Sequence, residues 1–229
     1  MKEITIAEKY ALCMLKEVKQ FSNDAEMSDY LLMCMIIEML FDKNLEIKDY
    51  NTKKTFEKTN KIKIKLTNTA PTSMYNKEFY QIIMEMNKQE IPIDDLLAYI
   101  CHGKSGFSDR NLNIITGLLE RQMVLDKLIT IEDKKTIFGN KEVIVINDKK
   151  FANVVEEIRS TMLKKDKYTN EFILLISLLN ATGFLKNLFI KYEKKTLKQK
   201  LEKIEDTKID KYVQIVKDII DSYDGIVIT

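Results

Sequence analysis

Cys101 and His102 are adjacent, and a thiol next to an imidazole is a combination that nucleophilic catalysis uses. Neighbours in sequence usually point in different directions, however, and no third group is placed to orient the imidazole. Gly103-Lys104-Ser105-Gly106 follows and resembles part of a phosphate loop, but it lacks the full Gly-x-x-x-x-Gly-Lys-Ser spacing and a preceding strand. We therefore expect a connecting loop here and no catalytic residues.

The other residues that could bind a metal or move a proton are scattered. Cys13, Cys34 and Cys101 are far apart, and no pair has metal or redox spacing, so we expect reduced core thiols, no metal and no cofactor. Glu38 is the only charged residue in the apolar run from Tyr30 to Phe41. Two interpretations stay open: an acid with a raised pKa, or a carboxylate that bonds a backbone amide or a cation across the core.

The charge of the chain is nearly balanced. Its 37 basic and 35 acidic residues leave a net charge of +2, so any contact with nucleic acid or membrane has to be local. Only Arg110, Arg121 and Arg159 carry the planar fork that grips phosphate bidentately, because all other basic residues are lysines. Three lysines alternate with apolar residues at positions 61, 63 and 65, and either meet phosphates on a strand face or protect a sheet edge.

The composition predicts a mainly α fold, because six glycines and two prolines among 229 residues provide few tight turns. Thr5 and Glu8 form a capping box before the first helix, and Asn44 is expected to take the left-handed conformation that ends the second. Apolar spacing predicts helices at residues 5–20, 27–43, 75–87, 92–100, 109–123, 151–164 and 169–188, and one or two within 193–223.

Two regions change to a period of two. Residues 45–50 and 61–66 predict a short antiparallel pair, whereas 129–131 and 143–146, joined through Gly139-Asn140, predict a β-hairpin. No linker or repeat divides the chain, so we expect a single domain, residues 1–229, with two buried central helices surrounded by amphipathic ones. The longest apolar run is shorter than the ~20 residues that cross a bilayer, and the start lacks a signal-peptide pattern, which predicts a cytoplasmic protein.

The expected hairpin tip has the composition of a membrane-contact element. Ile137 and Phe138 stand at its end and are flanked by Lys134, Lys135 and Lys141. An apolar tip between basic residues suits the interface of a membrane that carries anionic lipid. Alternatively the tip folds back onto the core, or pairs with a second copy of the chain to form a homodimer.

Several local strings carry a resemblance that covers most of the chain. They are Ile4-Thr5-Ile6-Ala7-Glu8-Lys9, Leu31-Leu32-Met33-Cys34-Met35-Ile36-Ile37-Glu38 followed by Asn44-Leu45-Glu46-Ile47, Ala70-Pro71-Thr72, Leu118-Leu119-Glu120-Arg121, and Leu174 to Leu188. In this order they resemble the Golgi phosphoprotein 3 family. The resemblance implies a helical domain with a short hairpin, bound peripherally to membranes that contain phosphatidylinositol 4-phosphate. It implies an adaptor that engages cytoplasmic tails of membrane proteins, and no enzyme activity.

The residues of the family's headgroup pocket are not matched. A tryptophan and three arginines of the family pattern fall on Asn23, Leu32, Ser108 and Asn111. Arg110 and Lys104 lie nearby and could form a partial substitute. Each lost bond between arginine and phosphate removes about 1.5–3 kcal/mol, so we expect the fold and a weaker anionic contact without tight phosphoinositide recognition.

Two functions of other classes remain as alternatives. A helix followed by a hairpin, residues 109–146, is also how a winged-helix nucleic-acid-binding domain ends. That helix offers only Arg110 and Arg121 as cations, and the chain is nearly neutral, which argues against nucleic acid as a partner. A protein-interaction scaffold without a lipid ligand is the second alternative, since it needs no pocket.

Overall fold

The computed structural model describes residues 3–18, 25–49, 62–102, 110–136, 139–165 and 167–206. These residues are mainly helical and include two small antiparallel sheets, which confirms the predicted fold class. The chain divides into two compact units. Unit 1 comprises residues 1–34 and 127–229, and unit 2 comprises residues 35–126, so the boundary falls inside the second helix.

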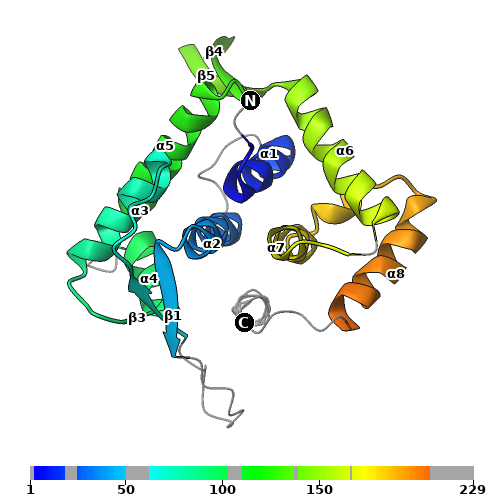
Figure 1. The fold of residues 1–229 in the computed structure, drawn as a ribbon. Coiled ribbons are helices and arrows are strands. Elements are labelled where there is room, and N and C mark those ends of the chain that lie inside the picture. The colour runs from blue at the N-terminus through cyan, green and yellow to red at the C-terminus, as the bar shows by residue number, and fades with distance from the viewer. Residues whose placement is uncertain are drawn as a thin grey trace, which may run out of the picture. The chain divides into compact units, whose positions relative to one another are not determined.

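Unit 1 holds most of the helices and the long hairpin. Its elements are α1 (Ile6–Val18), the first part of α2 (Ala25–Phe41), β4 (Ile129–Thr136), β5 (Gly139–Ile146), α6 (Asp148–Lys164), α7 (Asn170–Ala181), the 3-10 helix η1 (Leu185–Asn187) and α8 (Glu193–Asp206). In this unit α1 packs against α6 and α7, and α6 packs against α8 (Figure 1).

The predicted capping box is present at the start of α1. The Thr5 backbone N–H donates to Glu8 Oε2 (2.9 Å), and the Glu8 backbone N–H donates to Thr5 Oγ1 (3.2 Å). Together these bonds satisfy two donors that a helix start otherwise leaves open. The helix then buries Tyr10, whose ring lies 5.9 Å from that of Phe184.

The two helices predicted to be buried are buried. Each of them, α2 and α7, ends earlier along the chain than expected. In α2 every residue from Leu31 to Ile37 is 0% exposed. The left-handed residue after α2 is Lys43 (φ 59°) and not Asn44. Asn44 is the next residue along, where its N–H reaches Met39 O (2.7 Å) while the Lys43 N–H reaches Leu40 O (3.2 Å). This pair of bonds is a Schellman motif, which places the left-handed residue one position earlier.

The helix α7 begins one residue after the expected start, with Thr169 as its cap, and it ends early. The Thr169 hydroxyl accepts a hydrogen bond from the Phe172 N–H (3.2 Å). The helix stops at Ala181, because Gly183 takes a positive φ of 72° that a continuing helix excludes. The expectation of a helix to residue 188 was therefore wrong, and η1 occupies part of that segment.

Unit 2 packs three helices against a small sheet. Its elements are the end of α2, β1 (Leu45–Asp49), β2 (Lys63–Leu66), α3 (Met74–Glu85), β3 (Ile91–Pro92), α4 (Ile93–His102) and α5 (Arg110–Leu125). The antiparallel pairing of β1 with β2 confirms the predicted pair. The sheet has a third strand, β3, on the other side of β2, so the expected two-stranded segment is three-stranded. Here α5 packs against α3 and α4.

The position of β2 corrects the expectation for its lysines. Both Lys63 and Lys65 lie on β2, the central strand, and at Lys63 this strand is paired on both sides, so Lys63 does not protect a sheet edge. Lys63 instead pairs with Glu90 (3.6 Å). Position 61 lies outside the described residues. In the described part of the chain, no helix is long and apolar enough to cross a membrane.

Candidate functional site

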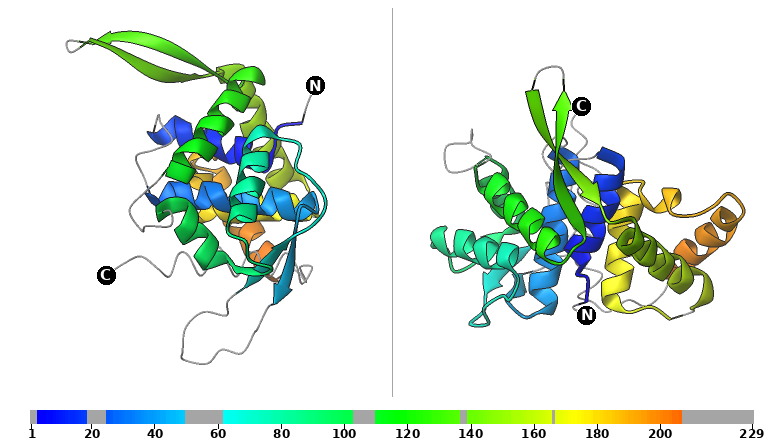
Figure 2. Two further views of the ribbon diagram at one scale, coloured as in Figure 1. Left: turned by 90° about the vertical axis from the view of Figure 1, so that its left-hand side faces the viewer. Right: turned by 90° about the horizontal axis from the view of Figure 1, so that it is seen from above.

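The hairpin of β4 and β5 is longer than expected, with eight residues in each strand. Asn147 closes its base, because its backbone N–H donates to Leu128 O (2.9 Å) and its side-chain amide donates to Lys127 O (3.0 Å). Leu128 and Ile129 are buried at this base, and β5 contacts α1. The outer half of the ribbon extends past the helices of its own unit (Figure 2).

The outer rungs of the hairpin place like charges opposite each other. Asp133 pairs with Glu142, and on the next rung Lys134 pairs with Lys141. Residues directly opposite in an antiparallel pair share a face, with Cβ atoms about 4.5–5.5 Å apart. All four side chains are exposed, and none of the ion pairs found among the described residues involves either lysine. One face therefore presents two adjacent ammonium groups, which we call the hairpin lysine pair.

The other predicted residues of the hairpin are placed only in part. Lys135 is exposed opposite Asn140, on the face that also carries Asp133 and Glu142. Ile131, on this face as well, is 43% exposed. Ile137 and Phe138, the predicted apolar tip, lie outside the described residues.

The predicted anion-binding residues belong to the other unit. Arg110 is the first residue of α5 in unit 2 and is exposed, whereas Lys104 lies outside the described residues. The pairing of Arg110 with Lys104 therefore stays a prediction from the sequence. The order of helix and hairpin expected for a winged helix is present in the chain, but α5 and the hairpin fall in different units.

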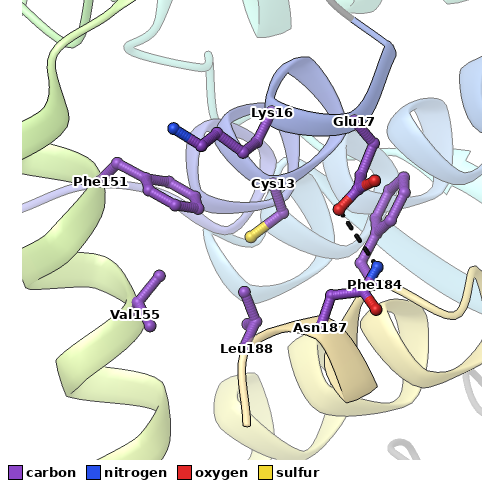
Figure 3. A pocket seen from close by; sticks show the side chains of 8 residues that line it. All are labelled: Cys13, Lys16, Glu17, Phe151, Val155, Phe184, Asn187 and Leu188. Carbon is purple, nitrogen blue, oxygen red and sulfur yellow. Dashed lines mark hydrogen bonds between the residues drawn. The ribbon is translucent and has the colours of Figure 1, made fainter. Parts of the chain in front are cut away.

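A small pocket in unit 1 was not predicted from the sequence. It has a volume of about 300 Å³ and is lined by Cys13, Lys16, Glu17, Phe151, Val155, Phe184, Asn187 and Leu188 (Figure 3). Its walls come from α1, α6 and the segment after α7, so no local sequence pattern announces it. The Lys16 ammonium lies 5.4 Å from the centre of the Phe151 ring, and the Asn187 amide donates to Glu17 Oε1 (3.1 Å).

The Cys13 thiol that lines this pocket is buried and protonated. Cys13 is 2% exposed, and burial raises the pKa of its thiol to about 12, with the nearby Glu17 charge raising it further. The thiol is therefore protonated at neutral pH, and thiolate is the form that attacks electrophiles. The Lys16 ammonium lies over the Phe151 ring, and its Nζ is 3.6 Å from Asp148 Oδ1.

The other residues that could bind a metal or move a proton are Glu38, Cys101 and His102. Glu38 is 7% exposed, and its Oε2 accepts hydrogen bonds from the Tyr75 hydroxyl (2.9 Å) and the Asn76 side-chain amide (3.0 Å). Both of these partners are side chains of α3. Cys101 is half-buried, and the side chain of His102 is outside the described part of the structure. Among the described residues no group of three metal-ligating side chains occurs.

Comparisons with known proteins leave the chain without a family. No protein-family model matches it, and no curated protein matches it significantly. The resemblance to the Golgi phosphoprotein 3 family therefore remains a prediction from the sequence, and the function has to be argued from the surface of the molecule.

Proposed function

We propose that this protein is a non-enzymatic peripheral membrane adaptor that rests on anionic lipid through its hairpin, on the cytoplasmic face of a membrane. The observation that carries the proposal is the hairpin lysine pair. Two like charges directly opposite each other destabilise a hairpin, and this cost falls when an anion lies against both. A bilayer with anionic headgroups supplies such a counter-charge over a continuous surface.

The remaining hairpin residues support the same use. Lys135 adds a third exposed ammonium near the end of the ribbon, and the sequence places Ile137 and Phe138 at the tip between the lysines. An apolar tip flanked by cations is the composition that inserts shallowly at the headgroup level. Two-stranded ribbons are marginally stable in water, so contact with a surface would also steady the outer rungs.

The proposal includes an adaptor function, which the resemblance to the Golgi phosphoprotein 3 family suggests. The lipid is an anionic lipid in general, because the positions of the family's three headgroup arginines carry Leu32, Ser108 and Asn111, and its tryptophan position carries Asn23. Arg110 and Lys104 would add a weak anion contact. Cytoplasmic tails of membrane proteins would be the cargo.

Replacing Phe138 with Asp tests the tip. Burying a phenylalanine side chain contributes about 1.5–3 kcal/mol, so Phe138→Asp should weaken binding to vesicles by about ten- to a hundredfold. The measurement is flotation with vesicles of equimolar phosphatidylcholine and phosphatidylserine, with far-UV circular dichroism to show an unchanged fold. Leu125→Asp is the matched control, since Leu125 is 68% exposed at the end of α5. Full binding by Phe138→Asp would show that the tip is not the anchor.

A further inference from the structure

The short segment between η1 and α8 exposes apolar side chains to solvent. Tyr192 is 82% exposed and Ile190 is 44% exposed. An isolated exposed apolar residue needs no explanation, but an aromatic and an aliphatic side chain two residues apart form a small apolar projection. The hydrogen bonds around this segment show that the projection is held in place.

A β-turn over residues 190–193 holds both Ile190 and Tyr192. The Glu193 N–H donates to Ile190 O (3.0 Å), which places Lys191 and Tyr192 at the two corners of the turn. The Glu193 carboxylate holds the turn from both sides, because its Oε2 accepts from the Ile190 N–H (3.1 Å) and its Oε1 accepts from Arg159 Nη2 (2.7 Å). Since Arg159 lies on α6, the turn is tied to a neighbouring helix.

Lysines surround this turn. Lys191 is at its corner, and Lys194, Lys195 and Lys198 follow on α8. Steps of three and four residues place them on one side of the helix start. All four are exposed, and the ion pairs found in the described ranges include none of them. The one acid within this stretch, Glu193, is already bonded to Arg159.

We propose that these residues, Ile190, Lys191, Tyr192, Lys194, Lys195 and Lys198, form a second lipid-contact surface, the Tyr192 patch, which binds an anionic bilayer. This inference rests on the proposed membrane function but uses no residue of the hairpin. Tyrosine suits the membrane interface because its ring is apolar and its hydroxyl is polar. Lysines close to an anionic surface add attraction without needing a fixed register.

The residue types favour a bilayer over a nucleic acid. The exposed cations of the patch are all lysines, whereas recognition of bases and phosphates relies strongly on the bidentate fork of arginine. The neighbouring Ile190 adds aliphatic surface, which lipid accepts and a phosphate backbone does not.

The test compares two lysine triplets of equal charge. The patch variant is Lys191→Gln with Lys194→Gln and Lys195→Gln. The control variant removes the same charge from exposed lysines elsewhere in unit 1, as Lys149→Gln with Lys164→Gln and Lys167→Gln. Each lysine near an anionic surface contributes about fivefold to partitioning, so the patch variant should bind equimolar phosphatidylcholine and phosphatidylserine vesicles about 100-fold more weakly than the wild type. The control variant should lose much less.

A second variant tests the ring. Tyr192→Ser should weaken vesicle binding at low and at high salt, because an apolar contribution is not screened as the lysine attraction is. Unchanged binding by Tyr192→Ser would remove the ring from the contact, and equal losses in the two lysine triplets would reduce the patch to general charge. Either result overturns the inference.

The outcomes separate this inference from the hairpin proposal. Loss in Phe138→Asp with full binding in the patch variant supports the hairpin and overturns the Tyr192 patch. Loss in the patch variant with full binding in Phe138→Asp supports the patch and overturns the tip. A wild type that ignores anionic vesicles overturns both. Retarded migration of single-stranded RNA that depends on Lys191, Lys194 and Lys195, without vesicle binding, would assign the patch to nucleic acid.

Discussion

The substitution Lys134→Glu should change the stability of the hairpin and its binding to membranes in opposite directions. In the wild type Lys134 is directly opposite Lys141 and both are exposed. Glutamate at position 134 turns a like-charge pair into an opposite-charge pair, which contributes about 0.2–1 kcal/mol to the pairing of the strands. The same change removes two positive charge units from the face proposed to meet lipid.

Two measurements follow these effects. Native-state amide hydrogen exchange reports local opening, and a gain of this size should slow exchange on the outer rungs by up to about fivefold. Vesicle flotation reports binding, which should weaken by about 25-fold, because each unit of charge near an anionic surface contributes about 1 kcal/mol. If the hairpin lysine pair had only a structural role, Lys134→Glu would slow exchange and leave vesicle binding unchanged.

Lys135→Glu is the matched control. Lys135 is opposite Asn140 on the other face, so this substitution makes the same charge change without resolving a like-charge pair. We expect weaker vesicle binding and no slowing of exchange. If Lys134→Glu slows exchange but binds vesicles like the wild type, the hairpin lysine pair is not the lipid contact. If exchange becomes faster, the two lysines are not opposed as described.

Two further predictions concern the stability of the fold. Tyr75→Phe removes the hydroxyl that donates to the buried Glu38 carboxylate (2.9 Å), so the free energy of unfolding in urea should fall by about 1.5–3 kcal/mol. The control is Tyr99→Phe, at a half-buried position of α4. Equal stability of the two variants would contradict the prediction. The hydrogen bond from Arg159 holds the pKa of Glu193 below its ordinary value of 4.5, so the stabilisation is present above this pH and disappears as the pH falls through the lowered pKa. Glu193→Gln should therefore be less stable than the wild type at neutral pH, with the difference vanishing in acid, and a difference that is constant across pH would refute this linkage.

Much of the fold could be predicted because its signals are local. The capping box of Thr5 and Glu8 and the apolar spacing of each helix act within a few residues. The hairpin was predicted from period-two segments and from Gly139-Asn140 as its turn. The position of the turn was wrong, because both residues lie in β5, opposite Thr136 and Lys135. The chain extended the hairpin by several rungs, because strands of charged and polar residues carry no apolar alternation to reveal them.

The features that were missed depend on contacts between distant segments. β3 has only two residues, and its pairing with β2 comes from the fold and not from a β-like run. The partners of Glu38 lie on α3, 37 and 38 residues away, so the sequence could not name them. The early end of α7 had a readable signal in Gly183, which the apolar residues on both sides obscured.

The candidate site likewise combines local features that the sequence shows with long-range features that it does not. The sequence identified the lysines of the hairpin, but the register that places Lys134 opposite Lys141 appears only in the structure. The Tyr192 patch was missed because Lys191, Lys194 and Lys195 resemble an ordinary solvated helix face. What distinguishes them is the fixed turn, whose Glu193 carboxylate accepts a hydrogen bond from Arg159 on α6.

The most direct test of the account is flotation of the wild-type protein with three sets of vesicles. One set contains phosphatidylcholine alone, and the other two carry the same surface charge from phosphatidylserine or from phosphatidylinositol 4-phosphate. The account predicts no binding to the neutral vesicles and similar, salt-sensitive binding to both anionic sets. A protein that floats with none of the vesicles would contradict the proposed membrane function, and strong binding only to phosphatidylinositol 4-phosphate would contradict the loss of the specific headgroup pocket.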